Sequence, residues 1–114
     1  MIVVEAAIRL NDPARRESLI AESAPIQRAT RRDEAGCVVY CFAADSVEPD
    51  LIQVYELWTD EESLHAHFQH PNYDAMRDLL NAAGLASAVS RKLRVDAASP
   101  VYDEDRRPIV DFPA

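Results

Sequence analysis

The 114-residue sequence lacks a long hydrophobic run, since no window approaches the roughly 18 apolar residues of a membrane span. Its N-terminus reads MIVVEAAIRL, without a basic segment ahead of an apolar one, so we expect no signal peptide. Positive charge is scarce, with 12 Lys and Arg against 20 Asp and Glu and a net charge of −8. Phosphate backbones and anionic lipids bind basic surfaces, so neither nucleic acid nor a membrane is an expected partner.

Cysteine is also scarce. Cys37 and Cys41 are the two cysteines, and both fall in one segment that reads as a strand. Four strand residues span roughly 13 Å, whereas the Cα atoms of a disulfide lie within about 7 Å. We therefore expect two small buried hydrophobes, with a reactive or intermolecular thiol as the alternative. The missing signal peptide and disulfide together predict a cytoplasmic protein.

The composition is that of one globular domain, with 48% hydrophobic and 28% charged residues. Residue periodicity predicts strands at 2–10, 37–44, 51–58 and 87–95, and helices at 13–33, 60–69 and 73–83. Asp12 and Asn72 are expected helix caps, and Thr59 with Glu62 forms a candidate capping box. Pro25 is expected to kink or interrupt the first helix.

The predicted order is β-α-β-β-α-β, which is the ferredoxin-like α+β arrangement of a four-stranded antiparallel sheet with helices on one face. The opposite face would carry apolar side chains, namely Val39, Cys41, Tyr55 and Leu57. An apolar sheet face of this size predicts burial against a second copy, hence a homodimer through the sheet face. Residues 1–95 form the predicted domain. Residues 96–114 read as an irregular tail, either disordered or exchanged onto the partner subunit.

Three segments resemble the antibiotic biosynthesis monooxygenase family. They are Glu34-Ala35-Gly36-Cys37-Val38-Val39-Tyr40, Tyr55-Glu56-Leu57-Trp58-Thr59-Asp60 and Ser63-Leu64-His65-Ala66-His67-Phe68. The resemblance covers residues 1–95 and implies a dimeric α+β barrel. It implies a cofactor-free oxygenase acting on quinols or polyketide anthrones, although other members of the family degrade haem or act on a phosphorylated sugar.

This chain departs from the family pattern at three places, and each departure bears on which of the family's activities it shares. Haem-degrading members have an asparagine on the first strand, where this chain offers only Ile2, Val4, Ala6 and Ile8. Anthrone oxygenases have an asparagine two residues before the motif glutamate, where this chain has Val54. Where the family usually has a Pro-His pair, this chain has Pro71-Asn72, with His70 directly before it.

The resemblance places a pocket between the sheet and the helices. Cofactor-free oxygenation needs a base, a hydrogen-bond donor for an oxyanion and a dry apolar pocket. The predicted catalytic residues are His67 as base, Glu56 as its orienting group or as the base itself, and Trp58 as an N–H donor. The predicted substrate-binding residues are Tyr40, Val54, Phe68, His70, Asn72 and Tyr73. The alternative for His67 is local packing and capping, and for Glu56 it is a structural hydrogen bond to a helix N-terminus or to the backbone. For Trp58, Tyr40 and Tyr73 the alternative is ordinary core packing.

No cofactor or metal is expected. His65, His67 and His70 form H-x-H-x-x-H, but on a helix His65 points roughly 200° away from His67. A site made by all three is therefore geometrically poor.

The excess negative charge lies in one segment. Residues 45–78 carry nine acids and a single base, Arg77, while the rest of the chain is balanced. Because this segment supplies most of the predicted pocket, we expect a neutral aromatic phenol or quinol, with O₂ as co-substrate, rather than a phosphorylated substrate. The alternatives are a non-catalytic small-molecule binding protein and an isomerase or lyase on the same fold.

Overall fold

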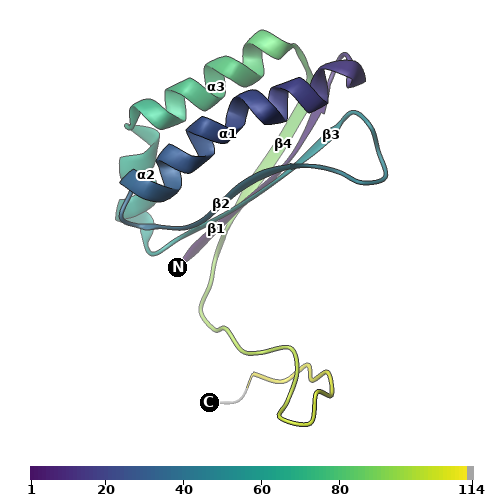
Figure 1. The fold of residues 1–114 in the computed structure, drawn as a ribbon. Coiled ribbons are helices and arrows are strands. Elements are labelled where there is room, and N and C mark those ends of the chain that lie inside the picture. The colour runs from purple at the N-terminus through teal and green to yellow at the C-terminus, as the bar shows by residue number, and fades with distance from the viewer. Residues whose placement is uncertain (113–114) are drawn as a thin grey trace.

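The computed structural model describes residues 1–112. Its strands are β1 (Ile2–Leu10), β2 (Cys37–Ala44), β3 (Leu51–Trp58) and β4 (Leu85–Arg94). Its helices are the 3-10 turn η1 (Pro13–Arg15), α1 (Arg16–Asp33), α2 (Glu61–Phe68) and α3 (Pro71–Ala83). The predicted strands and helices are therefore confirmed, with ends shifted by up to about three residues, as is usual for element boundaries (Figure 1).

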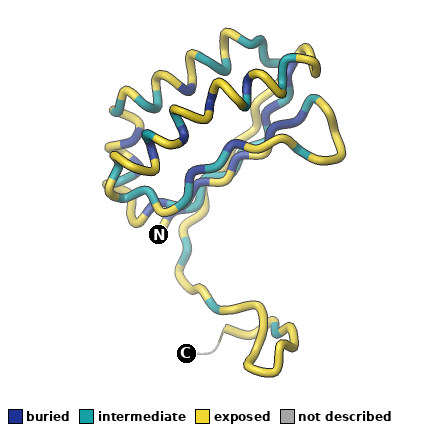
Figure 2. The backbone as a smooth tube through the Cα atoms, viewed as in Figure 1, coloured by how far each residue is buried: buried dark blue, intermediate teal, exposed yellow. Residues whose placement is uncertain are grey.

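The four strands form one antiparallel sheet in the order β2-β3-β1-β4, and the helices cover one of its faces (Figure 1). The predicted ferredoxin-like α+β fold is thus confirmed. Buried residues lie where this face meets α1 and α2, while β4 is largely exposed along its length (Figure 2). The helix-facing row Tyr40, Glu56, Val4 and Lys92 runs across all four strands, because these residues are register partners.

One of the three predicted helix caps is confirmed, and the other two were wrong. Asp12 caps the first turn as predicted, accepting a hydrogen bond from the backbone N–H of Ala14. The cap of α2 is Asp60, whose side chain accepts from the Ser63 backbone, rather than Thr59 with Glu62. The cap of α3 is His70 rather than Asn72, because Pro71 occupies the first helical position, which suits a residue without an N–H.

Helix α1 continues through Pro25 without interruption, against the prediction. Polar side chains, one of them the buried Gln27, fasten this helix to β2. Gln27 donates to the backbone oxygen of Phe42 and accepts from its N–H, at 3.2 and 3.0 Å. Arg31 donates from Nε to the backbone oxygen of Tyr40 at 2.7 Å. These contacts fix the edge strand that carries Tyr40 against α1, so packing against the sheet holds α1 together across the proline.

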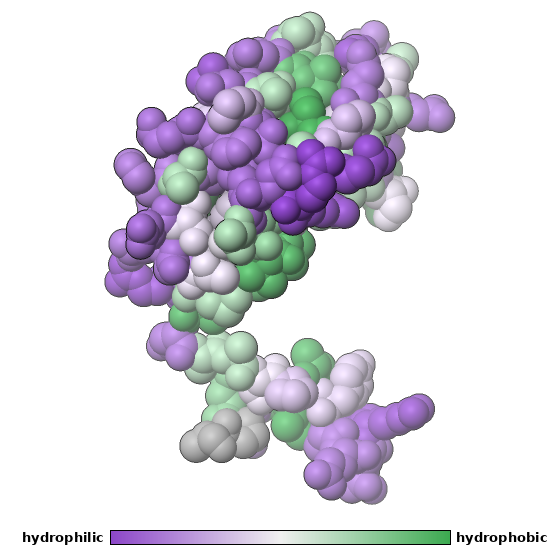
Figure 3. All heavy atoms as spheres, turned by 60° about the vertical axis from the view of Figure 1, so that its left-hand side comes forward, coloured by the Kyte–Doolittle hydropathy of each residue, from purple (hydrophilic) through white to green (hydrophobic). Residues whose placement is uncertain are grey.

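Residues 96–112 extend away from the sheet and hold one isolated bridge, between Tyr102 and Pro108 (Figures 1 and 3). Hydrophobic side chains in this tail are exposed, among them Val101, Tyr102, Val110 and Phe112. Among residues 1–112, no helix is both long and apolar enough to cross a membrane.

Candidate functional site

A buried cluster of aromatic and polar side chains lies between the sheet and α2. Trp58, Tyr40, His67 and Glu56 are 0, 1, 2 and 7% exposed. The rings of Trp58 and His67 stack with centroids 4.5 Å apart at 33°, and Tyr40 meets His67 edge-on at 5.5 Å. The structure therefore brings together the three predicted catalytic residues and Tyr40, and it buries all four.

His67 is held by Glu34, which lies at the end of α1. Nδ1 of His67 and Oε1 of Glu34 are 2.8 Å apart, and Asn72 donates from Nδ2 to the other Glu34 oxygen at 3.1 Å. The side chain of Glu34 is 7% exposed. The carboxylate hydrogen-bonded to His67 is thus Glu34, whereas Glu56 was the predicted partner. Glu34 is the first residue of the family motif that ends at Tyr40. Its place in that motif is the one sequence signal that could have identified it.

The environment of His67 favours a neutral imidazole with a free Nε2. Burial lowers the pKa of His67, against the raising effect of Glu34. A neutral ring that donates from Nδ1 to Glu34 carries its lone pair on Nε2. Within residues 1–112 Nε2 of His67 makes no hydrogen bond, so its lone pair is not engaged by another side chain.

Glu56 is a second candidate proton acceptor. Its Oε1 accepts from Nε1 of Trp58 at 3.0 Å. Burial raises the pKa of Glu56 to about 7, although the bond from Trp58 opposes this and the charge of Glu34 adds to it. Trp58 thereby uses its only side-chain donor within the cluster. Burial likewise raises the pKa of Tyr40, so its phenol stays protonated.

The remaining predicted residues surround His67, except for Val54. Tyr73 lies edge-on to His67 at 5.6 Å and to Phe68 at 5.3 Å. Nδ1 of His70 accepts a hydrogen bond from the backbone N–H of Asn72. The same nitrogen lies 4.0 Å from Oε2 of Glu34, but as an acceptor it carries no proton to donate to that carboxylate. Val54 is a buried core residue one row further along the sheet, beside Phe42.

An open groove of about 690 Å³ lies beside this cluster, between α2 and the strands β1 and β4. Its apolar floor is Ile2, Val4, Leu64 and Phe68. Val4 is the register partner of Glu56, and Phe68 follows His67, so the two candidate proton acceptors lie next to residues that line the groove. Of the predicted site residues, Phe68 is the one that lines it.

The cations of the groove come from outside the acidic segment. The acidic segment supplies Glu61, whereas β4 contributes Arg91, Lys92 and Arg94. Strand β4 lies far from that segment in sequence but pairs with β1 in the sheet. His65 also lines the groove from α2, on the same helix face as Glu61 and Phe68, a position that the sequence did not predict.

The three histidines of α2 and its end have separate positions. His67 points into the core, His65 lines the groove and His70 caps α3. Within residues 1–112 no group of three or more His, Cys, Asp or Glu side chains is placed to hold a metal ion.

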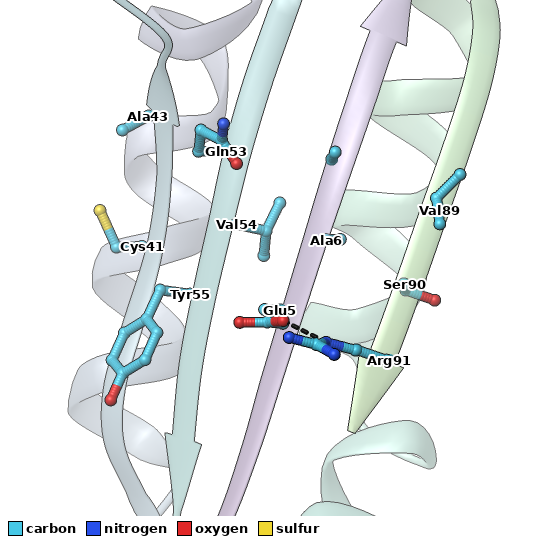
Figure 4. Close-up of a pocket in the computed structure, with 11 residues that line it drawn as sticks. Glu5, Ala6, Cys41, Ala43, Gln53, Val54, Tyr55, Val89, Ser90 and Arg91 are labelled. Carbon is cyan, nitrogen blue, oxygen red and sulfur yellow. Dashed lines mark hydrogen bonds and ion pairs between the residues drawn. The ribbon is translucent and has the colours of Figure 1, made fainter. Parts of the chain in front are cut away.

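A second hollow, of about 550 Å³, lies on the opposite face of the sheet (Figure 4). Tyr55, Cys41 and Val89 line it, and Glu5 pairs with Arg91 at its centre. Tyr55 is 45% exposed and Val89 is 69% exposed. This is the face that was predicted to pack on a second copy, and none of the candidate proton acceptors lies on it.

Comparison with known proteins gives a family assignment. The sequence model of the antibiotic biosynthesis monooxygenase family matches residues 1–79. A curated relative, an uncharacterized protein of Synechocystis sp., is 33% identical over 72 residues, which are 63% of this chain and 48% of the relative. The chain thus spans about half the length of that relative.

Solved structures share the fold. A candidate antibiotic biosynthesis monooxygenase from Deinococcus radiodurans superposes with a TM-score of 0.74 at 20% identity, over 90% of this chain and all of the other. One from Caulobacter crescentus gives 0.72 at 19% identity, over 86% of this chain and 91% of the other. At these identities the likeness shows the fold.

Proposed function

The chain belongs to the antibiotic biosynthesis monooxygenase family, and we propose that it is a cofactor-independent monooxygenase that oxidises an aromatic phenol or quinol with O₂. The observation that carries this proposal is the buried Glu34–His67 pair, whose imidazole lies 6.0 Å from the ring of Phe68, a residue on the apolar floor of the open groove. A histidine held by a carboxylate through one nitrogen is a general base at the other. The groove is large enough for a fused aromatic ring system, and its floor supplies an apolar surface for the rings.

The proposed reaction begins when Nε2 of His67 takes the proton of the phenol. The resulting anion is electron-rich and passes one electron to O₂, and the two radicals combine at a ring carbon as a hydroperoxide. Loss of water from this carbon leaves a carbonyl. A phenol and O₂ thus become a quinone and water, with one oxygen atom in each product, so no external reductant is required.

The cluster contributes more than the base. Glu34 fixes the tautomer of His67 and stabilises its protonated form after the transfer. The stacked Trp58 holds the imidazole plane. Glu56, with its pKa near neutrality, is the second group that can accept the proton.

We also propose that the opposite sheet face packs against a second copy of the chain. The support is the half-exposed apolar surface around Tyr55, Leu57 and Val89 on a face that no helix covers. The ion pair between Glu5 and Arg91 neutralises the charge at its centre, which lowers the cost of burying it (Figure 4).

The proposal is tested by following O₂ consumption and product formation with a panel of dihydroxynaphthalenes and anthrones. Stoichiometric O₂ uptake with quinone formation is the expected result. A product formed without O₂ consumption identifies an isomerase or lyase. Tight binding without turnover identifies a binding protein, and either outcome contradicts the proposal.

A further inference from the structure

The groove beside the Glu34–His67 pair has an apolar floor and one basic wall. Helix α2 presents Leu64 and Phe68 toward it. Every residue of β4 after Leu85 is exposed, so its helix-facing side chains, including Lys92 and Arg94, are open to solvent along the edge of the groove. A ligand in the groove therefore meets hydrocarbon below and cations on one side.

The three cations of this wall differ in their partners. Arg94 donates from Nη2 to Oε1 of Glu61 at 2.6 Å, and this ion pair neutralises the charge of Arg94. Arg91 pairs with Glu5 on the opposite face of the sheet (Figure 4). Lys92 lies between them in sequence and has no ion pair or hydrogen bond within residues 1–112. The groove therefore offers one uncompensated cation.

The sheet register sets the distance between this cation and the candidate bases. Val4 pairs with Glu56 on one side and with Lys92 on the other. The Cα atoms of Glu56 and Lys92 are thus two strand spacings apart, roughly 10 Å. A bicyclic or tricyclic aromatic lying over Val4 spans this distance, with its phenol toward Glu56 and His67 and its far edge toward Lys92.

We propose that the substrate carries one acidic group, a carboxylate, on the part of the ring system opposite the oxidised phenol, and that Lys92 binds it. The inference rests on the proposed function for the orientation of the phenol. A single unpaired ammonium beside an apolar floor favours a monoanionic aromatic over a neutral one. It also disfavours a phosphorylated sugar, which would leave Leu64 and Phe68 without an apolar partner.

The binding test separates this inference from catalysis. The probes are 6-hydroxy-2-naphthoate and 2-naphthol, which differ by one carboxylate, and their affinities are measured by calorimetry without turnover. We expect the naphthoate to bind about 5- to 10-fold more tightly to the wild-type protein. Lys92→Met should remove the preference, and Lys92→Arg should retain it. Arg77→Gln, which removes an exposed cation on α3, is the matched control and should leave it unchanged.

Chemical labelling gives a second readout. Lys92 is the only lysine of the chain, so acetylation by an amine reagent followed by peptide mass spectrometry reports on one side chain. The naphthoate should slow acetylation of Lys92 several-fold, and 2-naphthol should not.

Equal affinities for the two probes, a preference that survives Lys92→Met, or acetylation that the naphthoate does not slow would each overturn the inference. If the preference holds while no phenol in the panel consumes O₂, the acid-binding groove stands and the monooxygenase proposal fails. If O₂ is consumed but the protein shows no preference for a carboxylate, the monooxygenase proposal stands and the acid-binding groove fails.

Discussion

Nδ1 of His67 lies 2.8 Å from Oε1 of Glu34, although the two residues are 33 positions apart and belong to different helical regions. The contact joins the end of α1 to α2 beneath the aromatic rings of Trp58 and Tyr40. It leaves Nε2 as the basic nitrogen of a neutral imidazole whose pKa is lowered by burial. A proton acceptor is therefore ready for use at neutral pH without first losing a proton.

Replacement of Glu34 tests its role as a positioning residue. Glu34→Gln should lower kcat/KM about 10- to 100-fold, because a neutral amide holds the His67 tautomer less strictly. The variant should also move the acidic limb of the kcat/KM profile to lower pH, because the hydrogen bond and charge of Glu34 raise the pKa of His67. Glu17→Gln, on the exposed start of α1, is the control. An unshifted acidic limb in Glu34→Gln would show that Glu34 is merely structural.

The wild-type pH profile carries its own prediction. Burial lowers the pKa of His67 below 6.5, so the imidazole gains a proton only under more acidic conditions. The value of kcat/KM should rise with pH through a limb centred below pH 6.5 and then level off. A limb centred well above 6.5 would exclude His67 as the base.

Replacement of Glu56 tests the cost of burying its carboxyl group. Its pKa is raised from 4.5 to about 7 in the fold, so between these values the folded chain binds more protons than the unfolded chain. The free energy of unfolding should therefore fall as pH rises across this window. Glu56→Gln removes the titration and should stabilise the protein by about 2 kcal/mol at pH 8, with no gain at pH 4. Urea unfolding at both pH values measures this, and a pH-independent difference would contradict it.

Gly36 is predicted to be intolerant of a side chain. A Cβ at this position would lie 2.1 Å from Oγ and 2.2 Å from Cβ of Ser63, in the first turn of α2. Gly36→Ala should cost about 2 kcal/mol of stability and displace the helix that carries His67. Ser63→Gly in the same chain should recover most of the loss, because it removes the clashing atoms. No recovery in the double variant would mean that the clash is not the cause.

The uncovered sheet face predicts the oligomeric state. Light scattering should give twice the chain mass of 12.8 kDa. Tyr55→Glu should convert the dimer to a monomer, because it places a charge in the buried face. Val47→Glu, in an 86% exposed loop position, is the control and should leave the dimer intact. A wild-type mass of 12.8 kDa would contradict the proposed dimer.

The fold was predictable because its signals are local. Alternation along β1 and β3 and the caps and prolines near Asp12 and Pro71 mark the elements directly. The exact capping residues were less predictable, because Thr59 and Asp60 are adjacent and either side chain can cap α2. The continuity of α1 through Pro25 depends on packing against β2, which periodicity does not report.

The site was predictable only in part. Motif order brought His67, Trp58 and Tyr40 together, as the structure does. The Glu34 contact depends on how the end of α1 meets α2, which no spacing within one element reveals. The basic wall was missed because Lys92 faces the groove through a strand pairing with β1 that joins the two ends of the domain.

The most direct test of the account is the rate of O₂ consumption by His67→Gln compared with His65→Gln. The two histidines lie on the same helix, but His65 faces the open groove while His67 holds Glu34. With a phenol that the wild-type protein oxidises, His67→Gln should lower kcat about 10²- to 10⁴-fold. His65→Gln should stay within a few-fold of wild type. A folded His67→Gln variant that consumes O₂ at the wild-type rate would contradict the assignment of His67 as the base.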